Sequence, residues 1–318
     1  MSIDCQRAGG AHPYGKMTVS MEIEKNKHVQ WIDIQKPTGK DLAWLKQKFK
    51  LHPVIVDELR GPSARARVEQ YDGYLYFVYY FPMYDTEDAA SIRTEIDFIV
   101  TKHAVATVHY EPLTGVLEDF DVRAADSSLQ LVHAIIQHLL NFQERQLRHV
   151  REKVEAVGRD IFHDKEREIL EKITYLKRDI SEYRIVVKLQ EPTLKSLLAK
   201  GKAFWARDAK AEDVEAYLND LAGDHLKVMN QLEDYRDAVS DFEDTNNQLM
   251  NLKINTVMKT FTSLSFLTFP FMLVAALFSM NTIDTPIVNL PGAFYIIVGI
   301  MLVGMISLGI YFKNKKWF

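Results

Sequence analysis

The pattern of apolar and polar residues predicts a mixed α/β segment at residues 17–125, behind a flexible tail at 1–16. Alternating or aromatic-rich short runs are typical of strands, and such runs occur at 18–23, 30–34, 74–81, 95–100 and 104–109. The last two runs are separated only by residues 101–103, so we expect them to form a hairpin. A helix is expected at 38–49, with Thr38 as its N-cap. Together these elements predict a small sheet with helices.

Residues 126–259 are expected to be almost wholly helical. The pattern places helices at about 129–162 and 165–189, and a third starts near 212 and meets no stop signal before Ser279. At about 1.5 Å per residue, the third helix would be on the order of 100 Å long, far longer than an ordinary globular helix. A helix of this length needs partners along it, which favours an oligomeric bundle.

Two apolar stretches, 260–279 and 293–312, contain no charged residue. Each has the length of about 20 residues that a helix needs to cross a hydrocarbon core of about 30 Å. The alternative is a core hairpin of a soluble protein, but such helices would need a polar face, and neither stretch has one. We therefore expect two transmembrane helices joined by an outer loop at 280–292.

Basic residues predict the orientation of these helices. Lys253 and Lys259 precede the first, the tail at 313–318 follows the second, and the loop between them has no Lys or Arg. Because cytoplasmic flanks carry the excess of basic residues, we expect both termini in the cytoplasm of a multi-pass protein of the cell (inner) membrane.

Composition narrows the function further. The net charge is −4, which argues against a nucleic-acid binder, and the single cysteine, Cys5, excludes an intrachain disulfide framework. The chain has no glycine-rich phosphate loop, no nucleophile elbow and no clustered Cys/His site, so an enzyme is not expected. No cleavable secretory signal is recognisable at the N-terminus.

Three motifs stand around the first apolar stretch: Asn255-x-x-Met258-Lys259 before it, Pro270 within it, and Ser279-Met280-Asn281 at its end. The chain resembles the CorA family of divalent-cation channels and transporters, whose members carry Gly-Met-Asn at the outer mouth of the pore. Segments at 52–58, 65–69 and 74–76 and the basic C-terminus also resemble this family. The resemblance therefore spans most of the chain.

The resemblance implies a homopentamer in the lipid bilayer, with a CorA-like cytoplasmic funnel, long stalk helices and a pore lined by the first span. It also implies uptake of Mg²⁺, with a ring of Asn281 side chains as the selectivity filter. A neutral amide ring suits this ion, because Mg²⁺ dehydrates reluctantly and each amide oxygen can accept a hydrogen bond from its water shell. Taken alone, Asn281 would more simply be read as a residue that ends a helix.

The residues expected to line the pore follow from counting back from this mouth at helical spacing: Ala276, Met272, Phe269, Ser265, Thr262, Met258 and Asn255. The apolar pair Phe269 and Met272 would form a hydrophobic gate. This register depends on the resemblance, because every face of the span mixes Thr, Ser, Phe and Met.

The stalk carries a run of acids, of which Asp220, Asp224 and Asp244 are the candidates for a regulatory metal site. Such runs usually form a solvated face. The resemblance implies instead that carboxylates of neighbouring subunits bind Mg²⁺ and hold the pore closed. The histidines lie at irregular spacing, and nothing in their pattern resembles a zinc site.

Two departures from the family pattern leave the transported ion open. Ser279 replaces the glycine of the motif, and the outer loop lacks the usual Met-Pro-Glu, with Asp284 as its only acid. The alternatives are a Zn²⁺ or Co²⁺ transporter of the ZntB type and a non-conducting membrane scaffold.

Overall fold

In the computed structural model, the chain divides into two compact units, Met1–Phe242 and Glu243–Phe318. The structure describes residues 21–25, 28–85, 90–113, 116–117, 120, 125–163, 166–206, 209–280 and 291–315.

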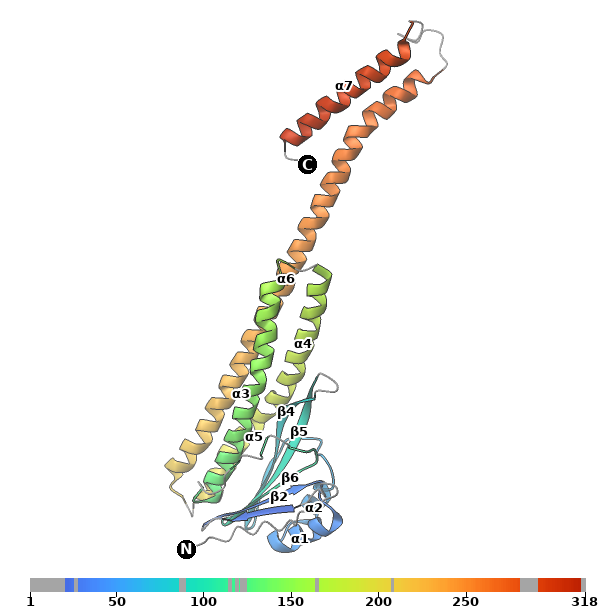
Figure 1. Cartoon of the computed structure of the whole chain (residues 1–318). Coiled ribbons are helices and arrows are strands. Elements are labelled where there is room, and N and C mark those ends of the chain that lie inside the picture. Colours follow the sequence, from blue (N-terminus) through green and yellow to red (C-terminus); the bar gives the residue numbers. More distant parts are fainter. Residues whose placement is uncertain are drawn as a thin grey trace, which may run out of the picture. The chain divides into compact units, whose positions relative to one another are not determined.

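A six-stranded sheet occupies the first unit (Figure 1). Its strands are β1 (Met21–Lys25), β2 (Gln30–Gln35), β3 (Val68–Tyr71), β4 (Tyr74–Asp85), β5 (Ala90–Val100) and β6 (Ala104–His109). The spatial order is β1-β2-β6-β5-β4-β3, and every neighbouring pair is antiparallel except β2 and β6. The hairpin across residues 101–103 is confirmed, whereas β3 is too short for the sequence pattern to have predicted it.

Two short helices, α1 (Gly39–Phe49) and α2 (Pro53–Glu58), pack on one face of the sheet. Helix α1 begins with the predicted cap: the Thr38 side chain accepts a hydrogen bond from Asp41 N, and the Asp41 carboxylate accepts one from Thr38 N at 2.8 Å. The core on this face joins Leu42 and Leu45 of α1 to Ile32 and Tyr76 of the sheet.

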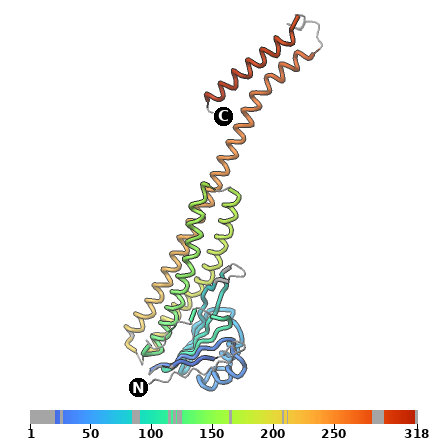
Figure 2. The backbone as a smooth tube through the Cα atoms, viewed as in Figure 1, coloured from blue at the N-terminus to red at the C-terminus, as the bar shows by residue number. Residues whose placement is uncertain are grey.

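Long helices cover the opposite face of the sheet. They are α3 (Ser128–Asp160) and α5 (Gln190–Trp205), and the start of α6 (Ala211–Phe278) joins the same core. Helix α4 (Glu166–Lys188) contacts β4 and β5, and its Val186 belongs to the core of the first face. In Figure 2, α3, α4 and the first part of α6 run side by side, and the ion pairs Lys153–Asp179 and Lys227–Glu144 join them. Since helices cover both faces, the central strands are largely buried, and every residue of β6 is buried.

Helix α5 is a separate element that the sequence pattern did not predict. Pro192 stands in its first turn, where a helix needs no backbone donor, so this proline begins a helix rather than ending one. The helix buries Leu194, Leu197 and Trp205 against the sheet and α3.

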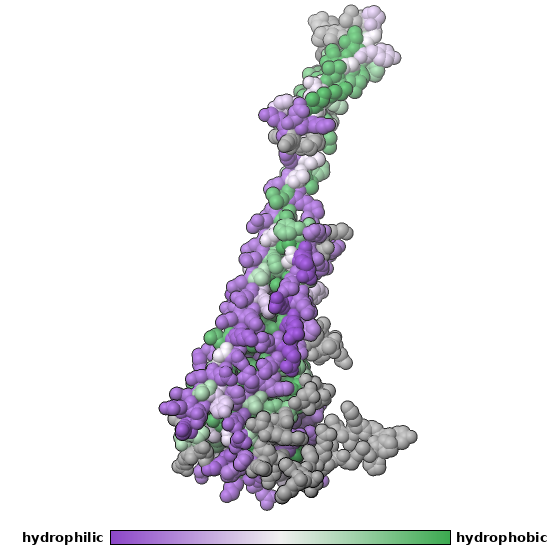
Figure 3. Space-filling model, turned by 60° about the vertical axis from the view of Figure 1, so that its left-hand side comes forward, coloured by the Kyte–Doolittle hydropathy of each residue, from purple (hydrophilic) through white to green (hydrophobic). Residues whose placement is uncertain are grey.

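The second unit contains the C-terminal part of α6 and the helix α7 (Ala293–Asn314). Both helices are long and apolar enough to cross a membrane. Hydrophobic residues gather over α7 and the last turns of α6 in Figure 3, and large side chains such as Phe269 and Tyr295 are exposed in the single chain. The two helices touch where Gly304 of α7 lies against the Phe271 ring.

Candidate functional site

The residues predicted to line a pore all lie on α6, and one observation orients them. A stripe along α6 is buried or half-buried within the single chain, and it consists of Ser263, Leu267, Phe271, Val274 and Phe278. Because Phe271 in this stripe touches Gly304, the stripe is the face that packs on α7.

The predicted pore-lining residues are exposed in the single chain: Asn255, Met258, Thr262, Ser265, Phe269, Met272 and Ala276. At about 100° per residue, the centre of this set lies roughly half a turn around the helix from the stripe that packs on α7. The predicted face is therefore the one that α7 leaves uncovered. Other residues of α6 are also exposed, so exposure alone does not single out this face.

The predicted filter motif begins directly after α6. Ser279 N donates to the carbonyl oxygens of Ala275 and Ala276, at 3.1 and 3.2 Å, and Ser279 Oγ also donates to Ala276 O, at 2.9 Å. The Ser279 hydroxyl thus satisfies a carbonyl at the end of its own helix, and its lone pairs can accept hydrogen bonds from water. Met280 N bonds Leu277 O, while Asn281 lies outside the described residues.

Five other hydroxyl groups in or near the apolar part of α6 also donate to carbonyl oxygens of their own helix. Each donates to the backbone carbonyl four residues earlier, and the set comprises Thr256, Thr260, Ser263, Ser265 and Thr268. Because no water is available in a hydrocarbon core, donors satisfied within the helix permit these residues in a membrane span.

Two of the three predicted regulatory acids contact α3. Asp220 Oδ2 lies 2.9 Å from His133 Nε2, and Asp224 accepts a hydrogen bond from the amide of Gln137. Asp244 is exposed and belongs to the second unit. Within the described part of one chain, no three His, Cys, Asp or Glu side chains are placed to hold a metal ion. A metal at Asp220 or Asp224 would therefore need ligands from beyond these residues.

The family model described as CorA-like Mg²⁺ transporter protein matches residues 26–315. The chain belongs to the CorA family. Because this is a family of transporters with apolar C-terminal helices, the chain is a membrane protein and not an enzyme.

Known CorA-like proteins match nearly the whole chain. The Bacillus subtilis protein YfjQ is 21% identical, covering 91% of this chain and 89% of its own. The cobalt/magnesium transport protein CorA of Thermotoga maritima is also 21% identical, covering 90% and 83%. The complete structure of the CorA magnesium transporter from Methanocaldococcus jannaschii superposes with a TM-score of 0.76 at 20% identity, covering 92% of each chain. The fold is thus that of a full-length CorA protein.

This CorA-family chain also buries a network of acids that sequence reasoning missed. Asp97, on β5, accepts hydrogen bonds from the hydroxyls of Tyr76 (2.8 Å) and Tyr110 (2.7 Å) and is fully buried. Glu95, two residues earlier on the same face, accepts the backbone N–H of Ser63 at 2.8 and 2.9 Å. Arg67, whose charge acts on Asp97, pairs with Glu58 at 2.9 Å.

Burial changes the protonation of these acids. It raises the pKa of Asp97 to about 7, although the hydrogen bonds from Tyr110 and Tyr76 act in the opposite direction. Burial and the neighbouring charge of Asp97 raise the pKa of Glu95 to about 8. Near neutral pH the network therefore retains protons that exposed carboxyl groups have lost.

A buried histidine, His109, is the last residue of the interior strand β6. His109 Nδ1 lies 2.7 Å from the carbonyl oxygen of Glu111, and Nε2 lies 3.2 Å from Asp33 Oδ2. A carbonyl oxygen and an ionised carboxylate both accept hydrogen bonds, so these contacts favour the protonated form of the ring. Burial alone would lower the pKa of His109, but the bonds to Asp33 and Glu111 outweigh it and raise the pKa.

Proposed function

We propose that this chain takes up Mg²⁺, or Co²⁺, across the cell membrane through a pore formed by a homopentamer. The observation that supports this proposal is the match of the CorA family over residues 26–315. The family relative from T. maritima is named for cobalt and magnesium transport, so a zinc-carrying ZntB-type function is not favoured.

The uncovered face of α6 would line the conducting path. Asn255 and Thr262 supply polar groups at one end, while Phe269 and Met272 supply a ring of apolar side chains that excludes water when the ring is narrow. With α7 on the opposite face, each subunit would present α6 to the axis and α7 to lipid.

Selectivity would reside in a ring of Asn281 side chains, flanked by Ser279 and Met280. Amide oxygens can accept hydrogen bonds from the water shell of Mg²⁺, so the ion need not lose that shell to be recognised. The Ser279 hydroxyl already donates its proton to Ala276 O. Toward the water shell of the ion, this hydroxyl would therefore act as a hydrogen-bond acceptor and not as a donor.

Regulation would depend on Asp220, Asp224 and Asp244, with cytoplasmic Mg²⁺ bound between subunits in the closed state. Asp220 is suited to this role because its side chain is 61% exposed, so a ligand from a neighbouring chain could reach it. A cation bound only in the closed state would shift the population toward that state by mass action. This requires a cytoplasmic first unit, as the basic flanks of the apolar segments predict.

Magnesium uptake into liposomes loaded with a Mg²⁺-sensitive dye tests the proposal. We expect uptake by the wild type, loss of uptake for Asn281→Ala, and unchanged uptake for Asn289→Ala, a matched asparagine of the same loop. Equal uptake by wild type and Asn281→Ala would contradict the filter. Absence of Mg²⁺, Co²⁺ and Zn²⁺ flux in a folded oligomer would instead identify a non-conducting scaffold.

A further inference from the structure

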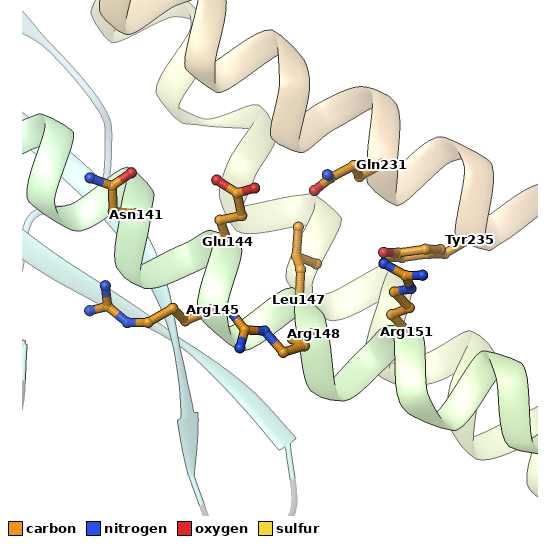
Figure 4. A pocket seen from close by; sticks show the side chains of 8 residues that line it. All are labelled: Asn141, Glu144, Arg145, Leu147, Arg148, Arg151, Gln231 and Tyr235. Atoms are coloured by element: carbon orange, nitrogen blue, oxygen red, sulfur yellow. The ribbon is translucent and has the colours of Figure 1, made fainter.

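An open cleft of about 530 Å³ lies in the first unit, between α3 and α6 (Figure 4). Its lining comprises Asn141, Glu144, Arg145, Leu147, Arg148 and Arg151 of α3 with Gln231 and Tyr235 of α6. The volume falls in the range of about 300–1,000 Å³ that is usual for small-molecule sites. None of these residues has a role in the proposed ion path.

The lining carries more positive than negative charge. Its single acid, Glu144, is paired with Lys227 at 2.8 Å, and Arg151 is paired with Glu155 at 2.8 Å. Across the described part of the chain, no carboxylate lies within ion-pair distance of Arg145 or Arg148. These two arginines stand three residues apart, so they are neighbours on the helix surface, where like charges repel. An anion bound between them would remove this repulsion.

The α6 wall adds groups that suit an organic ligand rather than a bare ion. Tyr235 is half-buried, and Figure 4 shows the Arg151 guanidinium beside its phenol group. Gln231, and Asn141 across the cleft, each offer an amide that can donate and accept hydrogen bonds. Leu147 is buried beneath them and gives the cleft an apolar floor.

We propose that this cleft binds a phosphate-bearing small molecule of nucleotide size. Arg145 and Arg148 bind the phosphates, because planar guanidinium groups form paired, charge-assisted hydrogen bonds with phosphate oxygens. Tyr235 contacts the ring system of the ligand, and the amides of Asn141 and Gln231 bond its polar edge.

Binding here would link the ligand to the pairing of α3 with α6. The same two helices are joined by His133–Asp220, Gln137–Asp224 and Lys227–Glu144. A ligand that contacts both helices favours conformations in which they stay paired, so it acts on the same contacts as a cation at Asp220. The inference goes beyond ion transport and does not depend on it.

The test is calorimetric titration of the full chain in detergent, in buffer stripped of divalent cations so that chelation does not contribute. The probes are ATP, inorganic triphosphate and adenosine. We expect ATP and triphosphate to bind, adenosine not to bind detectably, and the affinity for ATP to fall as salt is raised. Arg145→Gln with Arg148→Gln should weaken ATP binding at least about tenfold.

Arg167→Gln is the matched control, because Arg167 is an exposed arginine of α4 that lines no part of the cleft. It should bind ATP as the wild type does, and melting curves should show that all variants remain folded. The proposal is overturned if the wild type binds neither ATP nor triphosphate, if adenosine binds as tightly as ATP, or if the double variant retains full affinity. Since no ion flux is measured, these outcomes stay distinct from failure of the transport proposal.

Discussion

The two units of this chain place the same kinds of side chain in opposite environments. In the first unit, Phe77 and Phe98 are fully buried and stack with ring centroids 4.5 Å apart. In the second, Phe261 is 63% exposed, Phe269 67% and Phe294 70%. The first unit therefore gains stability from apolar burial within one chain, whereas the second must obtain it from lipid or from other copies.

Hydrogen bonding differs between the units in the same way. The first unit joins side chains that are far apart in sequence, such as Gln190 with Tyr80 O and Tyr183 with Gln143 O. The hydroxyls of the second unit bond to their own helix, as Ser265 does with Phe261 O. A helix that satisfies its own donors tolerates lipid, while a long-range network fixes one tertiary arrangement.

The largest expected contrast comes from truncating one phenylalanine in each unit. Phe77→Ala should lower the free energy of unfolding by about 3–5 kcal/mol, because it leaves a cavity in a packed core. Phe269→Ala should change it by less than about 0.5 kcal/mol, because the side chain has little packing to lose within its chain. Chemical unfolding of both variants in detergent measures the difference, and equal losses would show that Phe269 is packed as tightly as Phe77.

The next effect concerns the buried acids of the first unit. Unfolded carboxyl groups titrate near pH 4, whereas the folded pKa values of Asp97 and Glu95 are about 7 and about 8. The folded state thus retains protons that the unfolded state releases, so these groups lower the stability progressively as pH rises from about 4 to about 8.

Asp97→Asn should reduce the loss of stability between pH 4 and 8 by on the order of 4 kcal/mol, because the pKa of Asp97 is raised to about 7 and each pKa unit corresponds to about 1.4 kcal/mol. Asp57→Asn is the control, because the Asp57 side chain is 72% exposed. Unfolding free energies measured between pH 4 and 9 provide the comparison. An unchanged slope for Asp97→Asn would mean that Asp97 is ionised throughout this range in the folded protein.

The smallest effect comes from two glycines that meet the same steric problem. A Cβ at Gly201 would lie 2.8 Å from the Trp205 ring, and one at Gly304 would lie 2.9 Å from the Phe271 ring. Trp205 is buried and bonded to Ser128 Oγ, so Gly201→Ala should destabilise by about 1–2 kcal/mol. The Phe271 ring is only half-buried and can rotate away from an added Cβ. Because alanine is also more favourable than glycine in a helix by about 1 kcal/mol, Gly304→Ala should be neutral or slightly stabilising. Thermal melts in detergent compare the pair, and destabilisation by Gly304→Ala would reveal tight packing of α7 on α6.

The parts of the fold that depend on local pattern could be predicted from the sequence. The β5–β6 hairpin, the Thr38 cap and the two apolar helices each follow from neighbouring residues. The parallel pairing of β2 with β6 could not be predicted, because it joins segments about 70 residues apart, and periodicity does not encode partners.

The same limit applies to the candidate site. The residue types along α6 and the family pattern predicted which residues belong to the candidate site. The contacts of Asp220 and Asp224 with α3 could not be predicted, because each joins residues 87 positions apart in the sequence. Glu95 and Asp97 were missed for another reason: alternating acids on a strand usually mark a solvated face, and here helices cover that face.

The position of the strands early in the sequence has a consequence for folding during synthesis. All six strands lie within residues 21–109, so the sheet can close once this part of the chain has left the ribosome. The apolar segment that starts near residue 260 is synthesised about 150 residues later, which takes roughly 8 to 30 s at about 5–20 residues per second. The six strands therefore have time to pair before the first apolar segment has been translated.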